Sequence, residues 1–145
     1  MKKENLSTEI LKNRLLESED LDQFIQNHQI SLDSENFNDY LYALIESKGL
    51  KVSFALQQAQ MSESYGYQLI SGKRQPSRDK VIQLAIGLKL TLFEANRLLK
   101  LSGKSELYVK EQRDAVFMFA LNKSWSLYDV ESLLLERGLE CLIQK

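Results

Sequence analysis

The spacing of apolar residues constrains the fold of this 145-residue chain more than any other feature of its sequence. Val52, Ala55, Leu56 and Ala59 recur at intervals of three and four, which is the pattern of a helix with one buried face. The same spacing runs through the rest of the chain. Alternating β-branched residues, which are typical of strands, are absent. The sequence therefore predicts an all-α fold.

Capping residues divide the middle of the chain into five short helices. Gly49 predicts a left-handed end to the first helix. Ser62 and Ser77 are N-cap candidates for the third and fourth helices, and Thr91 with Glu94 forms a capping box for the fifth. We accordingly expect three parts, an N-terminal helical arm (1–36), a five-helix bundle (37–103) and a C-terminal helical hairpin (104–145).

The chain also contains an internal repeat with an offset of 35 residues. Residues 78–103 align without gaps on residues 113–138, and eight pairs are identical: Arg78/Arg113, Asp79/Asp114, Val81/Val116, Ala85/Ala120, Leu92/Leu127, Leu98/Leu133, Leu99/Leu134 and Gly103/Gly138. This predicts a repeated helical hairpin whose two units stack like a minimal solenoid. An aspartate in a first helical turn is favoured by the helix dipole, so the Arg-Asp pairs are expected to be architectural.

Length and composition are those of an ordinary globular protein. A chain of this size can bury a core without disulfides or metals. Its single cysteine, Cys141, cannot form an internal disulfide, and neither a secretory signal nor a membrane-length apolar run is visible. We therefore expect a cytoplasmic protein that does not enter a membrane.

The net charge of −1 conceals an uneven distribution. Residues 1–36 contain four Lys/Arg against eight Asp/Glu, whereas residues 37–103 contain nine against five. A basic middle segment favours a polyanionic partner, although scattered surface charge explains the same count equally well.

The segment from residue 52 to residue 77 carries the clearest functional signal. Two short predicted helices are joined by a tight turn, and the second is followed by the loop "SGKRQPS". This arrangement is the one that places a second helix in the major groove of DNA. The N-terminus of that helix would direct backbone amides at phosphates, and the Gly-Lys-Arg loop would add two cations.

Residues 37–99 resemble the Cro/CI-type (XRE-family) helix-turn-helix domain of bacterial and phage repressors. The resemblance rests on "SKGLKVSFALQQAQMS", "SYGYQLISGKRQPSRDKVIQLAIGL" and "TLFEANRLL", and the loop follows the family's glycine–basic–basic–x–Pro–Ser pattern. Residues 64–143 further resemble Firmicutes members of the family that have an extra C-terminal helical hairpin. The resemblance implies a five-helix, lambda-repressor-like bundle that binds double-stranded DNA and regulates transcription.

The resemblance also implies which residues contact DNA. The recognition helix would span about residues 62–71, with Ser62, Glu63, Ser64, Tyr67 and Gln68 facing the groove. Gln68 would read a base, since a carboxamide can pair bidentately with adenine. Lys73 and Arg74 would neutralise phosphates, and Ser71 or Tyr67 would add hydroxyl contacts. The alternative is that these polar side chains are only the solvated face of a helix.

Two positions depart from the family pattern. Gln60 stands in the turn where a glycine is usual, and Gly66 stands inside the recognition helix where Val or Ile is usual. Gly66 either lets the two helices approach closely while Tyr65 and Tyr67 fill the space, or leaves Tyr67 to contact a thymine methyl or a phosphate. Glu63 would repel phosphate unless it accepts a hydrogen bond from a cytosine amino group.

The sequence supports other classes of function less well than DNA binding. His28 is the one histidine, no glycine-rich phosphate loop is present, and we expect no enzyme, cofactor or metal. The rival is a protein-interaction module of the same fold with a degenerate DNA face. The second hairpin has more apolar residues than two helices need: Phe117, Met118, Phe119, Trp125, Leu133, Leu134 and Leu135. They indicate either core or a surface, for a homodimer that reads paired half-sites or for a protein partner.

Overall fold

The structure is a computed structural model that describes residues 8–17, 19–20 and 35–143. These residues form eight α-helices and no strand, so the all-α prediction is confirmed. The chain divides into two units, residues 1–35 and 36–145. In the first unit, α1 (Thr8–Glu17) is the described helix of the predicted arm, most of whose other residues lie outside the described ranges. No described helix is both long enough and apolar enough to cross a bilayer.

The second unit contains the remaining seven helices: α4 (Phe37–Ser47), α5 (Val52–Gln58), α6 (Glu63–Ile70), α7 (Arg78–Gly87), α8 (Leu92–Leu101), α9 (Gln112–Lys123) and α10 (Leu127–Glu136). The five helices predicted in residues 37–103 are α4 to α8, and the predicted hairpin is α9 and α10. Ser62 and Ser77 accept hydrogen bonds from backbone N–H groups of the first turns, as predicted. Thr91 and Glu94 form the predicted capping box.

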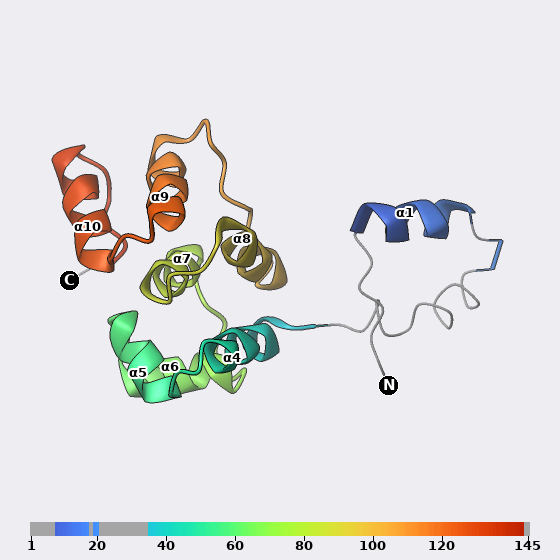
Figure 1. Cartoon of the computed structure of the whole chain (residues 1–145), viewed down its shortest axis with the longest axis horizontal. Coiled ribbons are helices and arrows are strands. Elements are labelled where there is room, and N and C mark those ends of the chain that lie inside the picture. Colours follow the sequence, from blue (N-terminus) through green and yellow to red (C-terminus); the bar gives the residue numbers. More distant parts are fainter. Residues whose placement is uncertain (1–7, 18, 21–34, 144–145) are drawn as a thin grey trace. The chain divides into compact units, whose positions relative to one another are not determined.

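Helix α7 lies at the centre of this unit, between α4–α6 and α9–α10 (Figure 1). Every residue from Val81 to Gly87 is buried, because α7 packs against α5, α8, α9 and α10. The hydrophobic core therefore runs without interruption from Phe37 to Leu142. The boundary expected between residues 103 and 104 falls inside one unit.

The predicted repeat is present in the helix boundaries and in the turns. Helix α8 and helix α10 occupy positions 35 residues apart along their whole length. Lys89 and Ser124 both have left-handed backbones with φ of 55°. The glycines that end the two hairpins, Gly103 and Gly138, have φ of 75° and 70°.

The repeat continues past the residues that were aligned in the sequence. Leu107 and Leu142, which also lie 35 residues apart, are both buried. The N–H of Leu107 donates to Asn96 Oδ1 at 2.9 Å, and the N–H of Leu142 donates to Glu131 Oε1 at 2.8 Å. Asn96 and Glu131 are themselves equivalent, so each hairpin fixes its exit segment in the same way with a different acceptor.

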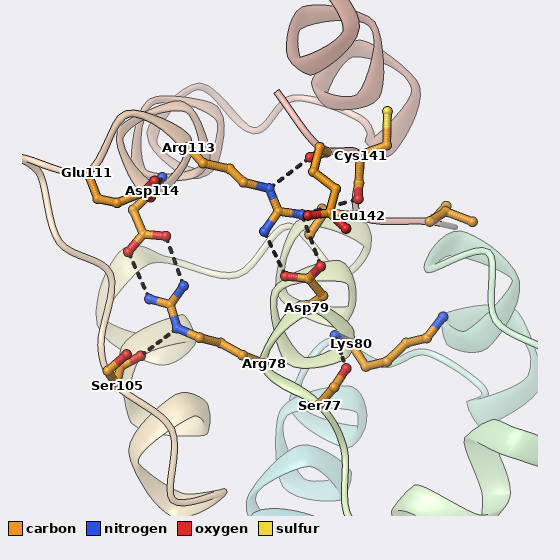
Figure 2. Close-up of polar contacts among 12 residues, drawn as sticks. Ser77, Arg78, Asp79, Lys80, Ser105, Glu111, Arg113, Asp114, Cys141 and Leu142 are labelled. Carbon is orange, nitrogen blue, oxygen red and sulfur yellow. Dashed lines mark hydrogen bonds and ion pairs between the residues drawn. The ribbon is translucent and has the colours of Figure 1, made fainter. Parts of the chain in front are cut away.

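In the two Arg-Asp pairs, each arginine forms an ion pair with the aspartate of the other hairpin (Figure 2). Arg78 donates Nη1–H and Nη2–H bonds to the two carboxylate oxygens of Asp114 at 2.9 and 2.8 Å. Arg113 does the same with Asp79 at 2.8 and 3.0 Å. Each arginine Nε also donates to a backbone carbonyl that follows its own hairpin, 3.1 Å from Ser105 O and 2.8 Å from Glu140 O. The architectural role predicted for these residues is confirmed, and it consists of joining the hairpins.

This reciprocity differs from the solenoid stacking that we expected. If the two hairpins were related by translation, the arginine of the first would contact the second, and the equivalent arginine of the second would point away from the first. Here each unit reaches into the other, which is the pattern of an isologous, two-fold contact. The helix pairs agree, because α7 contacts α9 and α10 while α9 contacts α7 and α8, and α8 does not contact α10.

Asp114 is the most buried of the four charged groups. Its side chain is 5% exposed, compared with 30% for Asp79. Burial alone would raise the pKa of Asp114, but the hydrogen bonds from the Arg78 guanidinium and the Tyr108 N–H outweigh burial and hold the pKa below its ordinary value. The carboxylate is therefore charged at neutral pH, and the Arg78 guanidinium is required to offset the cost of burying that charge.

Removal of the two arginines should consequently have unequal effects on stability. Arg78→Ala leaves the buried Asp114 carboxylate without a cation, and we expect a loss of about 2–4 kcal/mol in the free energy of unfolding. Arg113→Ala leaves the more exposed Asp79, and we expect about 1–2 kcal/mol. Chemical denaturation measures both losses. The exposed Arg137→Ala is the control and should change stability by less than about 0.5 kcal/mol. Equal losses for Arg78 and Arg113 would contradict the role of burial.

Candidate nucleic-acid interface

Helices α5 and α6 are joined by a tight turn that α7 holds in place. Gln83 is fully buried in α7, and its Nε2 donates to Ala59 O at 2.7 Å and to Gln60 O at 3.3 Å. Gln60 has a φ of 53°, a left-handed conformation that costs a non-glycine residue about 1 kcal/mol. A glycine would adopt this conformation without that cost.

Two glycines allow close packing around α5, Gly66 where α6 packs on it and Gly87 where α7 packs on its C-terminal end. A Cβ added to Gly66 would lie closer to the Leu56 methyl carbons than the sum of two van der Waals radii, and a Cβ added to Gly87 would lie 2.5 Å from Ala59 Cα. The prediction that Gly66 allows close approach is confirmed. The accompanying prediction that Tyr67 fills the space is wrong, because its side chain faces outward and is 47% exposed.

The outward side of α6 carries the residues that the sequence singled out. Seven of the eight are exposed, namely Ser62, Glu63, Ser64, Tyr67, Ser71, Lys73 and Arg74, and Gln68 is half-buried. Gly66 and Leu69 are buried and face the core. The helix itself runs from Glu63 to Ile70 with Ser62 and Ser71 as its caps, in agreement with the predicted range of about 62–71.

The loop after α6 turns back onto the end of that helix. Gly72 has a φ of 82°, and the N–H groups of Lys73 and Arg74 both donate to Gln68 O, at 2.9 and 3.2 Å. The Arg74 side chain follows, since its Nε donates to Gln68 Oε1 at 2.9 Å. Its guanidinium carbon lies 5.3 Å from the centre of the Tyr65 ring, within the range of a cation–π contact. The cationic loop is thereby held beside the exposed face of α6.

Two residues that support this interface were not predicted. Gln83 does have a recognisable signal, because a lone glutamine inside the apolar run "VIQLAIGL" indicates a buried hydrogen bond. For Tyr65 the sequence indicates only a space-filling role. In the structure its ring lies beneath Arg74 and also 5.7 Å from Lys80 Nζ, so it gathers two cations. No feature of the sequence indicates that convergence.

The arrangement presents hydrogen-bond donors on the exposed face of α6 and two cations in the loop that follows it. Hydroxyl, carboxamide, ammonium and guanidinium groups are the side-chain groups that contact phosphates and base edges in DNA complexes. Among the described residues, no group of three or more His, Cys, Asp or Glu side chains is placed to hold a metal ion. The chain matches no protein-family model, no curated protein and no solved structure.

The packing at Gly66 provides a test of how α6 is supported. Gly66→Ala should lower the free energy of unfolding by about 1–3 kcal/mol, because the added methyl group has to displace the buried Leu56 side chain. Alanine's higher helix propensity offsets only part of this loss. Ser64→Ala on the exposed face of the same helix is the control and should be nearly neutral. A stabilised Gly66→Ala variant, measured by thermal or chemical denaturation, would rule out the close packing.

Proposed function

We propose that the chain is a sequence-specific regulator of transcription that binds double-stranded DNA with α6 in the major groove. One observation carries the proposal, namely that the exposed face of α6 lies directly beside the exposed Lys73 and Arg74. The resemblance to Cro/CI-type repressors supports the same assignment. The proposal requires no cofactor and no catalysis.

The residues of the interface divide into those that position the protein and those that read sequence. Lys73 and Arg74 neutralise phosphates that flank the groove, which supplies affinity for any duplex. Ser62, as N-cap, already accepts from the Tyr65 N–H at 3.2 Å, so its hydroxyl hydrogen is available to a phosphate oxygen. Gln68 reads adenine through its carboxamide. Glu63 accepts a hydrogen bond from a cytosine amino group, or else it repels phosphate and weakens binding.

Binding to random duplex DNA should depend steeply on salt concentration. Replacement of Lys73 and Arg74 together by alanine should reduce the slope of log K against log[salt] by about two units, because each cation releases about one counterion. The melting temperature should change little, because both side chains are exposed and the contacts of Arg74 with Gln68 and Tyr65 lie at the surface. Fluorescence anisotropy at several salt concentrations measures the slope.

The matched control is Lys104→Ala with Lys110→Ala, which removes two exposed lysines from the segment between α8 and α9. This control should leave the slope unchanged. A slope that responds equally to both double variants would mean that the charge acts non-specifically. A slope that responds to neither would favour the rival function, a protein-interaction module.

We further propose that the second hairpin forms a homodimer interface. Of the seven apolar residues singled out in the sequence, Phe117 and Leu134 are core, and Phe119 and Leu135 are exposed. Leu135 is 69% exposed and lies seven positions after Tyr128, which is 75% exposed, so the two share one face of α10. A dimer would place two copies of α6 on paired half-sites of DNA. The same surface is the candidate site for a protein partner.

The repeat supplies a control for this interface. Phe93 is the counterpart of Tyr128 and is 72% exposed, but the counterpart of Leu135 is Lys100, so α8 lacks the apolar face. Tyr128→Ser with Leu135→Ser should convert the dimer to monomer in sedimentation experiments. Phe93→Ser should not change the sedimentation coefficient. A monomeric wild-type chain at micromolar concentration would rule out the dimer.

A further inference from the structure

We propose that Arg74 is a positioning residue for Gln68, which fixes the orientation of the carboxamide that reads the base. The proposal rests on the proposed function and deepens it, because it assigns part of the sequence preference to a residue that the cationic loop pattern would assign only to phosphate. Three observations carry it: the hydrogen bond between the two side chains, the anchoring of Arg74, and the contrast with Lys73.

The end of α6 and the loop are tied together at Gln68. Its backbone oxygen accepts from the N–H groups of both Lys73 and Arg74. Its side-chain oxygen, Oε1, accepts from Arg74 Nε at 2.9 Å. Gln68 and Arg74 therefore cannot move independently unless the two hydrogen bonds between them are broken.

The chemistry of the pair decides which end of the carboxamide faces the loop. A guanidinium has donors and no acceptor, so only the oxygen of Gln68 can face Arg74. The amide nitrogen must then point in the other available direction. An exposed glutamine without such a partner can exchange its oxygen and nitrogen by rotation about its last side-chain bond. Arg74 removes that freedom before DNA is bound.

Arg74 is itself held in place by a second contact. Its guanidinium lies over the ring of Tyr65, one turn earlier on α6 than Gln68. The ring and the carboxamide oxygen together determine where the planar guanidinium can lie. A cation that served only to neutralise phosphate would need no such restraint.

A fixed carboxamide has a defined use in the major groove. Adenine offers a donor, N6–H, beside an acceptor, N7, and a carboxamide pairs with both only when its oxygen and nitrogen are in the matching order. The Oε1 atom retains a second lone pair for N6–H. Arg74 therefore sets which order is presented, and with it which orientation of an A·T pair is preferred. Ordering before binding also reduces the entropy lost on association.

Lys73 provides the contrast within the same loop. It is exposed like Arg74 and has the same charge, but only its backbone N–H contacts Gln68. Lys73 is thus a matched cation without a bond to the reading side chain. The two residues should have similar effects on the salt dependence of binding and different effects on sequence preference.

The experiment is a double-mutant cycle on sequence preference. Wild-type protein selects its preferred duplex from a random library, and affinities are then measured for that duplex and for one in which the A·T pair assigned to Gln68 is reversed. Gln68→Ala, which identifies this pair, should reduce the affinity ratio by about 5- to 150-fold. Arg74→Ala should reduce the ratio by about 3- to 10-fold, and should have no further effect on it in the Gln68→Ala background. Lys73→Ala should lower both affinities and leave the ratio unchanged.

Each outcome decides the matter. An unchanged ratio in Arg74→Ala, or Arg74 and Gln68 effects that simply add, would overturn the positioning role. A Gln68→Ala protein that keeps its preference at every base pair would overturn it as well. The proposed function is tested separately by the wild type, because a wild-type chain without salt-dependent binding to duplex DNA would remove DNA binding itself. If wild-type binding is normal and only the cycle fails, the proposed function stands without this inference.

Discussion

Helix α7 is enclosed by other helices, and the arrangement of the second unit follows from its burial. Seven consecutive residues of α7 are buried, whereas an amphipathic surface helix buries only one face. On one side of α7, Gln83 donates a hydrogen bond to the turn between α5 and α6, and Gly87 leaves room for that turn to pack closely. The N-terminal end joins the second hairpin through Arg78 and Asp79. Helix α7 therefore supports both the candidate interface and the second hairpin.

In the candidate interface, the residues that hold α6 in place differ from those proposed to contact DNA. Gly66 and Leu69 hold α6 on the core, whereas the residues proposed to contact DNA are exposed or half-buried. In the loop that follows, Arg74 is exposed yet contacts both the Gln68 carboxamide and the Tyr65 ring. Such restraint is typical of sites in which side chains must be ordered before a ligand arrives.

Local signals in the sequence were sufficient for the helices but not for the contacts between them. Caps such as Ser62, Ser77 and Thr91 lie within a turn of the backbone groups that they satisfy, so sequence spacing reveals them. The partners of Arg78 and Arg113 lie more than thirty positions away. The repeat showed that these residues matter, and the helix dipole gave a sufficient local reason, but only the structure shows that the pairs cross. The exposed face of α6 was predictable from periodicity, whereas the contact of Arg74 with Gln68 depends on how the loop turns back.

The crossing of the two ion pairs has a consequence for any shortened form of the protein. A chain that stopped after residue 108 would retain Arg78 and Asp79 and would lose both of their partners at once. The amino-terminal end of α7 would then carry two unmatched charges, and its far side would be bared to water where α9 and α10 had covered it. Neither of those helices contacts α6, yet their loss would weaken the helix on which Gln83 supports the turn before α6. Premature termination after residue 108 would thus weaken the support of α6, although neither α9 nor α10 contacts that helix.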